Sequence, residues 1–134
     1  MQAKIIASRD LFDFDEGGFM AEIINVRHEN WEAGDLLAWE PGKPEKWWTQ
    51  KGFFDVLGLP CFHIHEESGA PIHIYRTPET WTKHKGNGVV ALYWPMARIT
   101  LSRVTLIAED EKHRAEIDRH YRMPRPKILI QNAG

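Results

Sequence analysis

The apolar residues of this chain come in short runs, each long enough for a β-strand and none long enough for a membrane-spanning helix. Such runs cover residues 3–7, 19–26, 35–39 and 89–94. None approaches the roughly 18 apolar residues of a membrane span, so the pattern excludes a span, and a coiled coil or a collagen as well. With 134 residues, the chain is expected to form one domain, residues 1–134, that needs no metal or disulfide to fold.

Turn and capping residues predict where helices interrupt the strands. Pro44 suits the first position of a helix that carries Trp47 and Trp48, because its missing N–H needs no partner there. Thr77 is a good N-cap for a helix over residues 79–85. The remaining segments are predicted as an acidic turn over 10–18, a second helical turn over 53–57, a hairpin over 61–76, a bulged strand over 97–108, a charged helix over 109–122 and a final strand or extended tail over 127–130.

These elements add up to an α+β fold. About seven strands and three helices at irregular intervals do not make a regular βαβ array. We therefore expect a small curved antiparallel sheet or a partly open β-barrel, with two or three peripheral helices.

Charge is spread unevenly along the chain. The net charge is −2, which excludes a global basic field of the kind that attracts nucleic acid. Residues 1–45 carry ten acids against four bases, a net charge of −6, which leaves +4 for the rest of the chain. The basic side chains gather near the C-terminal end and predict a local basic edge for phosphate groups, with Arg119, Arg122 and Arg125 as candidates.

Six tryptophans are more than the core of so small a domain can hold. Some are therefore expected to stack on a ligand, a base or a partner protein. The candidate ligand-binding residues, beyond the three arginines above, are Arg27, Asn30, Trp31, Trp39, Trp47, Trp48 and Tyr75.

A second candidate site is a group of histidines. In the hairpin over residues 61–76, a three-residue turn would place His63, His65 and His73 on one face, with His63 opposite His73. Three imidazoles with an open position form the ligand set of a catalytic divalent transition metal such as zinc, and Cys61 or Glu67 would supply a fourth ligand. A polar, solvated sheet face is the alternative interpretation.

Residues 27–39 resemble a segment of PUA-like domains, including the ASCH and EVE types, in which a strand end bearing Arg and Asn leads through a Gly-Asp turn into a barrel strand. The ASCH pattern also has a glycine, a lysine and a glutamate on the preceding strand. Gly18 and Glu22 match it, but no lysine stands between them, so a catalytic lysine is not carried over. Over residues 18–39, the resemblance implies a PUA-type barrel that binds RNA or a modified base in an aromatic cleft.

Three functions remain open. The first is a small binding module that recognises a nucleotide or nucleic acid through aromatic stacking and a local basic edge. The second is a metal-dependent hydrolase that uses the three histidines, and the third is an accessory or inhibitory protein of a phage or mobile element that acts through a partner protein. No catalytic residue is identified, so the sequence does not decide whether the chain is an enzyme.

The expected location is the cytoplasm, without a membrane partner. Cys61 is the single cysteine and has no partner for an internal disulfide. The first six residues carry too little apolar content for a signal peptide.

Overall fold

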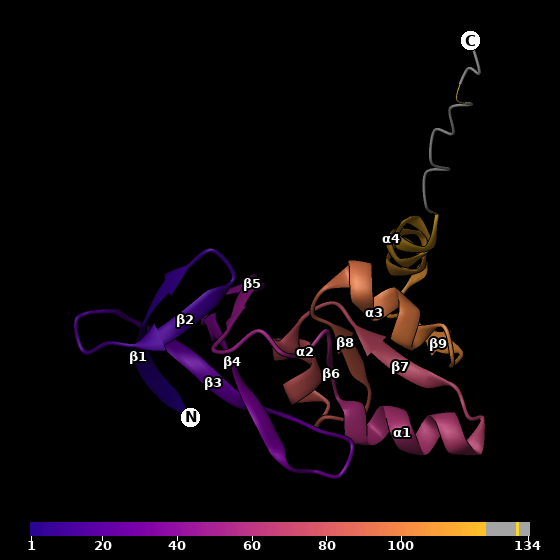
Figure 1. Cartoon of the computed structure of the whole chain (residues 1–134), viewed down its shortest axis with the longest axis horizontal. Helices are drawn as coiled ribbons and strands as arrows, with labels where there is room; N and C mark the ends of the chain where they lie inside the picture. Colours follow the sequence, from indigo (N-terminus) through magenta and orange to yellow (C-terminus); the bar gives the residue numbers. More distant parts are fainter. Residues whose placement is uncertain (123–130, 132–134) are drawn as a thin grey trace.

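The computed structural model describes residues 1–122 and residue 131 (Figure 1). Five strands form a closed barrel, and a second, four-stranded sheet with four helices follows it, which confirms the α+β class. The barrel strands are β1 (Gln2–Ser8), β2 (Leu11–Phe14), β3 (Phe19–Arg27), β4 (Ala33–Glu40) and β5 (Lys43–Thr49). The later elements are β6 (Val56–Leu57), α1 (Leu59–Ser68), β7 (Ile72–Tyr75), α2 (Pro78–Lys83), β8 (Val89–Ala91), α3 (Trp94–Leu101), β9 (Leu106–Ile107) and α4 (Glu111–Tyr121).

The barrel closes in the order β1-β2-β5-β4-β3. All its strand pairs are antiparallel except β2 and β5, which run parallel where Leu11 faces Thr49. The barrel is closed and mixed, and it matches the second of the two predicted architectures, a small curved antiparallel sheet or a partly open β-barrel, except that it closes fully. Alternate residues of its strands form a buried cluster: Ile5, Phe12, Ala21, Ile23 and Ala38.

An irregularity interrupts the pairing of β4 with β5. Trp39 pairs with Trp47, but the next residue of β4, Glu40, pairs with Lys43, so residues 44–46 have no counterpart in the register. Such a bulge accommodates Pro44, which has no N–H for the ladder. The predicted helix from Pro44 onward is therefore wrong, and Trp47 and Trp48 lie on a strand.

The second sheet has the order β6-β8-β7-β9. β7 runs parallel to both β8 and β9, and β6 runs antiparallel to β8. The helices connect and cover these strands (Figure 1). A buried cluster joins the sheet to α1, α3 and α4 through Phe62, Ile74, Ala97, Leu101 and Ile117, among others.

The barrel and the second sheet share part of their core. One buried cluster contains Val26, Leu37 and Trp39 from the barrel together with Leu57 and Val90 from the sheet. Trp47 of β5, Tyr75 at the end of β7 and Leu92 just after β8 also pack in this cluster, so β5 lies beside the ends of β7 and β8.

Other local predictions were confirmed or corrected. The strands near 3–7, 19–26, 35–39 and 89–94 and the helices near 79–85 and 109–122 are present, with small shifts of their ends. Residues 11–14 form a strand within the predicted acidic turn, residues 56–57 form a strand in place of a helical turn, and residues 94–101 form a helix in place of a bulged strand. The predicted tail over 127–130 lies outside the described residues.

Among the helices that the structure describes, none combines the length and the apolar composition that crossing a bilayer requires.

Candidate functional site

The predicted histidine site depended on a hairpin that does not form. His63 and His65 lie on helix α1, and His73 lies on strand β7. The imidazole of His63 contacts the carboxylates of Glu29 and Glu67, at 3.9 and 3.4 Å, and His65 Nδ1 lies 3.2 Å from the carbonyl of Ala70. Over residues 1–122 and 131, no group of three or more His, Cys, Asp or Glu side chains lies close enough to hold a metal ion.

Two of the predicted stacking residues belong to the packing of the barrel. Trp39 is 3% exposed and lies in the core that joins barrel and sheet. Trp48 packs edge-on against Phe19, with 5.5 Å between the ring centroids, while Lys46 Nζ lies 5.9 Å from the Trp48 ring. Neither lines the cavities described below, and that they bind a ligand stays a prediction.

Arg27 and Trp31 do come together in one cavity, which we call the basic cavity. It has a volume of about 150 Å³ and lies beside the start of α1 and the end of α2. Asn30 does not line it, since its side-chain oxygen accepts a hydrogen bond from the Glu32 amide and shapes the turn. The residues that line the basic cavity are Asn25, Arg27, Trp31, Leu57, Gly58, Pro60, Cys61, Trp81, Lys85 and Gly86.

The predicted basic edge is only partly described. Arg119 and Arg122 are exposed on and just after α4, and neither lines any of the cavities of the described residues that we discuss. Arg125 lies outside the described residues.

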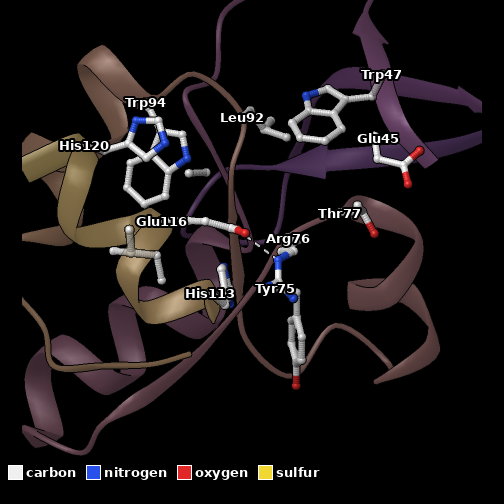
Figure 2. Close-up of a pocket in the computed structure, with 12 residues that line it drawn as sticks. Glu45, Trp47, Tyr75, Arg76, Thr77, Leu92, Trp94, His113, Glu116 and His120 are labelled. Carbon is white, nitrogen blue, oxygen red and sulfur yellow. Dashed lines mark hydrogen bonds and ion pairs between the residues drawn. The ribbon is translucent and has the colours of Figure 1, made fainter. Parts of the chain in front are cut away.

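A larger cavity, of about 300 Å³, lies where β7 and β8 end, and we call it the strand-end cavity (Figure 2). The carboxyl ends of parallel strands are a common place for ligands, because the chain leaves the sheet there in loops. β5 of the barrel and α4 supply the other walls. The lining residues are Glu45, Trp47, Tyr75, Arg76, Thr77, Ala91, Leu92, Trp94, His113, Glu116, Ile117 and His120.

Aromatic rings stand on two sides of the strand-end cavity. Trp94 stacks on His120, with 4.5 Å between ring centroids and 7° between ring planes. Figure 2 shows this pair on one side and Trp47 on the other, with Leu92 between them and Arg76 and Glu116 below. The predicted residue Tyr75 also lines the cavity, but its hydroxyl donates to the carbonyl of Asn87, outside the cavity.

Arg76, at the end of β7, ties the strand to α4. Its Nε donates to Glu116 at 3.0 Å, its Nη2 to Asp110 at 3.0 Å and its Nη1 to Glu109 at 3.2 Å. These hydrogen bonds lower the pKa of the Asp110 and Glu116 carboxyls and raise the pKa of the guanidinium. Arg76 is thus neutralised by three carboxylates and does not attract an anion into the cavity.

His113 contributes a neutral donor. Its ring is 4% exposed, and its Nδ1 accepts a hydrogen bond from the Glu109 amide at 3.0 Å, which leaves the proton on Nε2. Burial, followed by the charge of Arg76, lowers its pKa, which keeps the ring neutral at pH 7. Nε2 has no hydrogen-bond partner among residues 1–122. Every side-chain nitrogen or oxygen that is sealed from solvent in this part of the chain does have a partner, so Nε2 is not sealed. Nε2 is therefore reached by solvent, and the residue lines the strand-end cavity.

A groove continues from the strand-end cavity along β5, and we call it the β5 groove. The two share Glu45, Trp47 and Leu92. Beyond Trp47, the groove carries three cations. Lys46 is paired with Asp10 at 3.2 Å, whereas Arg9 and Lys51 have no ion-pair partner in the part of the chain that the structure describes.

Sequence reasoning missed most of this site. His113, Glu116 and His120 were inside a correctly predicted helix at spacings of three and four, which place them on one face, so that signal was available. Trp94 and Glu45 carried no such signal, because the segments around them were assigned to the wrong elements.

Comparisons of this chain with protein-family models, curated proteins and solved structures give no match. The function is therefore inferred from the residues of the site.

Proposed function

We propose that this chain binds a nucleotide, free or within a single strand of nucleic acid, with the base in the strand-end cavity and the phosphate in the β5 groove. The observation that carries the proposal is the combination of two indoles, two carboxylates and a neutral histidine donor in one cavity at the strand ends. Flat apolar walls favour a base ring, since every base has a face that stacks on aromatic side chains.

The polar groups of the cavity favour a base with an exocyclic amino group. The carboxylates of Glu45 and Glu116 are acceptors for the amino protons, and His113 Nε2–H is a donor for a ring nitrogen. Adenine and cytosine present such a donor beside such an acceptor. The same carboxylates disfavour a phosphate inside the cavity, because they repel its charge.

The phosphate is then directed into the β5 groove. Arg9 and Lys51 are exposed cations without an ion-pair partner in residues 1–122, and the groove joins the cavity at Trp47. These two residues replace the predicted basic edge of Arg119 and Arg122 in the proposal.

The resemblance of residues 18–39 to PUA-like domains supports the same function. It implies a barrel that binds RNA or a modified base in an aromatic cleft, and the chain does contain a closed five-stranded barrel whose strand β5 forms one wall of the cavity.

The first experiment is a calorimetric titration with two pairs of nucleoside monophosphates, AMP against IMP and CMP against UMP. Within each pair, the ring is kept and the amino group is replaced by an oxygen. We expect AMP and CMP to bind, and IMP and UMP to bind at least tenfold more weakly, because an oxygen faces the carboxylates. Equal affinity within both pairs would contradict the role of the carboxylates.

Variants then test the walls. Trp47→Leu is expected to weaken AMP binding by about 1–3 kcal/mol, the usual contribution of one stacked base. Trp31→Leu is the matched control, because Trp31 is an exposed indole in the other cavity. If both variants bind AMP like the original chain, the base does not lie at Trp47.

A single-stranded oligonucleotide tests the phosphate path. Arg9→Gln and Lys51→Gln should each weaken binding of a cytosine-rich decamer and reduce its dependence on salt, since each phosphate contact releases counterions. Arg119→Gln serves as the control and should leave both quantities unchanged. If only Arg119→Gln weakens oligonucleotide binding, the phosphate lies at the end of α4 and not in the β5 groove.

A further inference from the structure

The basic cavity lies at the opposite end of β8 from the strand-end cavity. Gly58 and Gly86, which line it, come beside the start of β8, whereas Ala91 and Leu92 at the end of β8 line the strand-end cavity. The two cavities share no lining residue. A ligand in one is therefore separate from a ligand in the other.

Two cations line the basic cavity without a carboxylate partner. Neither Arg27 nor Lys85 makes an ion pair with any residue that the structure describes, and no carboxylate lines the cavity. Arg76 and Arg114, in contrast, are each paired with acids. Two unmatched cations at one small cavity favour an anionic group there.

The walls of the basic cavity are two indoles held in place. Trp81 Nε1 donates to the carbonyl of Gly88 at 2.9 Å, which fixes that ring. Trp31 is 62% exposed and adopts a φ of +73°, a rare conformation for a bulky residue. This strained turn is held by the Arg27 guanidinium, whose Nη1 donates to the carbonyl of Trp31 at 2.8 Å.

The volume limits the size of the ligand. A cavity of about 150 Å³ is the size that holds one benzene ring. A purine nucleoside does not fit within that volume, so the ligand differs from the one proposed for the strand-end cavity.

We propose that the basic cavity is a second binding site, for a small aromatic acid that has one six-membered ring and a carboxylate or phosphate group. The ring lies against Trp31 and Trp81, and the anionic group lies at Arg27 and Lys85. This inference is independent of the nucleotide proposal.

Cys61 makes the proposal directly testable, because it lines the basic cavity and is the single cysteine of the chain. Alkylation by iodoacetamide, followed by mass spectrometry of the whole protein, therefore reports access to this cavity alone. Burial raises the pKa of the thiol, so the assay is run at alkaline pH. We expect benzoate at ten times its Kd to slow alkylation about tenfold, because about a tenth of the cavities stay empty.

The same alkylation assay is repeated with two further compounds. Benzamide is the neutral isostere of benzoate, and phenyl phosphate is a second anion with the same ring. Protection by benzoate, by phenyl phosphate or by both supports the site and identifies the preferred anion. No protection by either anion, or equal protection by benzamide, overturns the proposal.

Charge variants complete the second series. Arg27→Gln and Lys85→Gln should each weaken benzoate protection about tenfold or more, while Lys83→Gln, a nearby cation that pairs with Glu79 and does not line the cavity, should keep it. Because Arg27 also holds the Trp31 turn, Lys85→Gln is the decisive variant. If benzoate fully protects a folded Lys85→Gln protein whose alkylation rate without benzoate is unchanged, Lys85 does not bind the anion. That result would overturn the assignment.

Discussion

The six tryptophans divide into three pairs with different surroundings. Trp39 and Trp48 pack within the barrel, Trp47 and Trp94 face the strand-end cavity, and Trp31 and Trp81 face the basic cavity. The excess of this residue type is thus explained by two cavities with two indoles each. From the sequence, the excess alone could indicate ligand or partner contacts, but it could not indicate how the indoles would be grouped.

Asp35 shows how a single buried side chain can organise a loop of the barrel. Its carboxylate accepts hydrogen bonds from the amides of Leu36, Lys51, Gly52 and Phe53, at distances from 2.8 to 3.4 Å. These bonds hold the end of β5 and with it Lys51 of the β5 groove.

We expect Asp35→Asn to lower the free energy of unfolding by about 1–3 kcal/mol, because an amide nitrogen replaces one acceptor and leaves backbone N–H groups without a partner. Asp13→Asn is the control, since Asp13 is exposed and accepts only from the adjacent Phe14 amide. Urea unfolding measures both. A loss of the same size in the two variants would show that the loop amides do not depend on Asp35.

At the scale of the element, prolines near helix starts explain both the successes and the failures of the sequence predictions. Pro60, Pro78 and Pro95 each lie in the first turn of a helix. Of these three prolines, only Pro78 was predicted to start a helix, because Thr77 before it is a recognisable cap. Pro44 has the same local appearance, yet it lies in the bulge of β5, where pairing with β4 decides the structure.

Residues 61–66 were mistaken for a strand because of a false alternation. Phe62 and Ile64 suggested one apolar face, but in helix α1 Phe62 is 5% exposed and Ile64 is 56% exposed. Pro60 at the start and Gly69 at the end were the signal for a helix. The class of fold could therefore be predicted from strand-length runs, whereas the candidate site could not, since it depends on contacts between β5, β7 and α4 that no local pattern encodes.

Gly69, which follows α1, and Gly88, which precedes β8, allow a matched test of how much stability an added Cβ costs at each position. Gly69 has a φ of +75° and no atom within 4 Å of an added Cβ, whereas Gly88 has a φ of +148° and would place a Cβ 2.6 Å from the carbonyl oxygen of His73. Gly69→Ala should cost about 1 kcal/mol of backbone strain. Gly88→Ala should cost more than about 3 kcal/mol, because strain and a backbone clash add.

Thermal and urea unfolding of the two variants provide the measurement. An equal loss of stability in Gly69→Ala and Gly88→Ala would mean that the start of β8 can move away from β7, contrary to the parallel pairing of Ile74 with Val89.

At the scale of the whole molecule, the ion cluster around Arg76 joins the central strand of the second sheet to the last described helix. Four charged side chains and one neutral histidine are concentrated where β7 ends and α4 begins. Their pKa shifts make the stability of the chain dependent on pH in two separate ranges.

The first range is set by histidine. The pKa of His113 lies below its ordinary value of about 6.5, so the unfolded chain binds the proton more readily, and stability falls as the pH drops below about 6.5. His120 has the same direction of shift and adds to this range. His113→Asn keeps an acceptor for the Glu109 amide and should reduce, without abolishing, the loss of stability as the pH falls below about 6.5.

The second range is set by Asp110 and Glu116. Their pKa values are lowered in the folded chain, so their stabilising effect is present above about pH 4.5 and is lost as the pH falls through the folded values. Arg76→Met should flatten this second loss and also reduce the first, because the charge of Arg76 contributes to the lowered pKa of His113. Urea unfolding at a series of pH values separates the two, and an unchanged profile in both variants would show that the cluster does not set the acid response.

The bulge in β5 has a consequence for how this protein can change during evolution. Glu45 belongs to the residues that have no counterpart in the β4–β5 register, yet it lines the strand-end cavity. Because pairing of β5 with β4 does not use these residues, substitutions at Glu45 change the lining of the cavity while the barrel keeps its closure. If the cavity binds the proposed nucleotide, selection can act on ligand preference at this position almost independently of selection for folding.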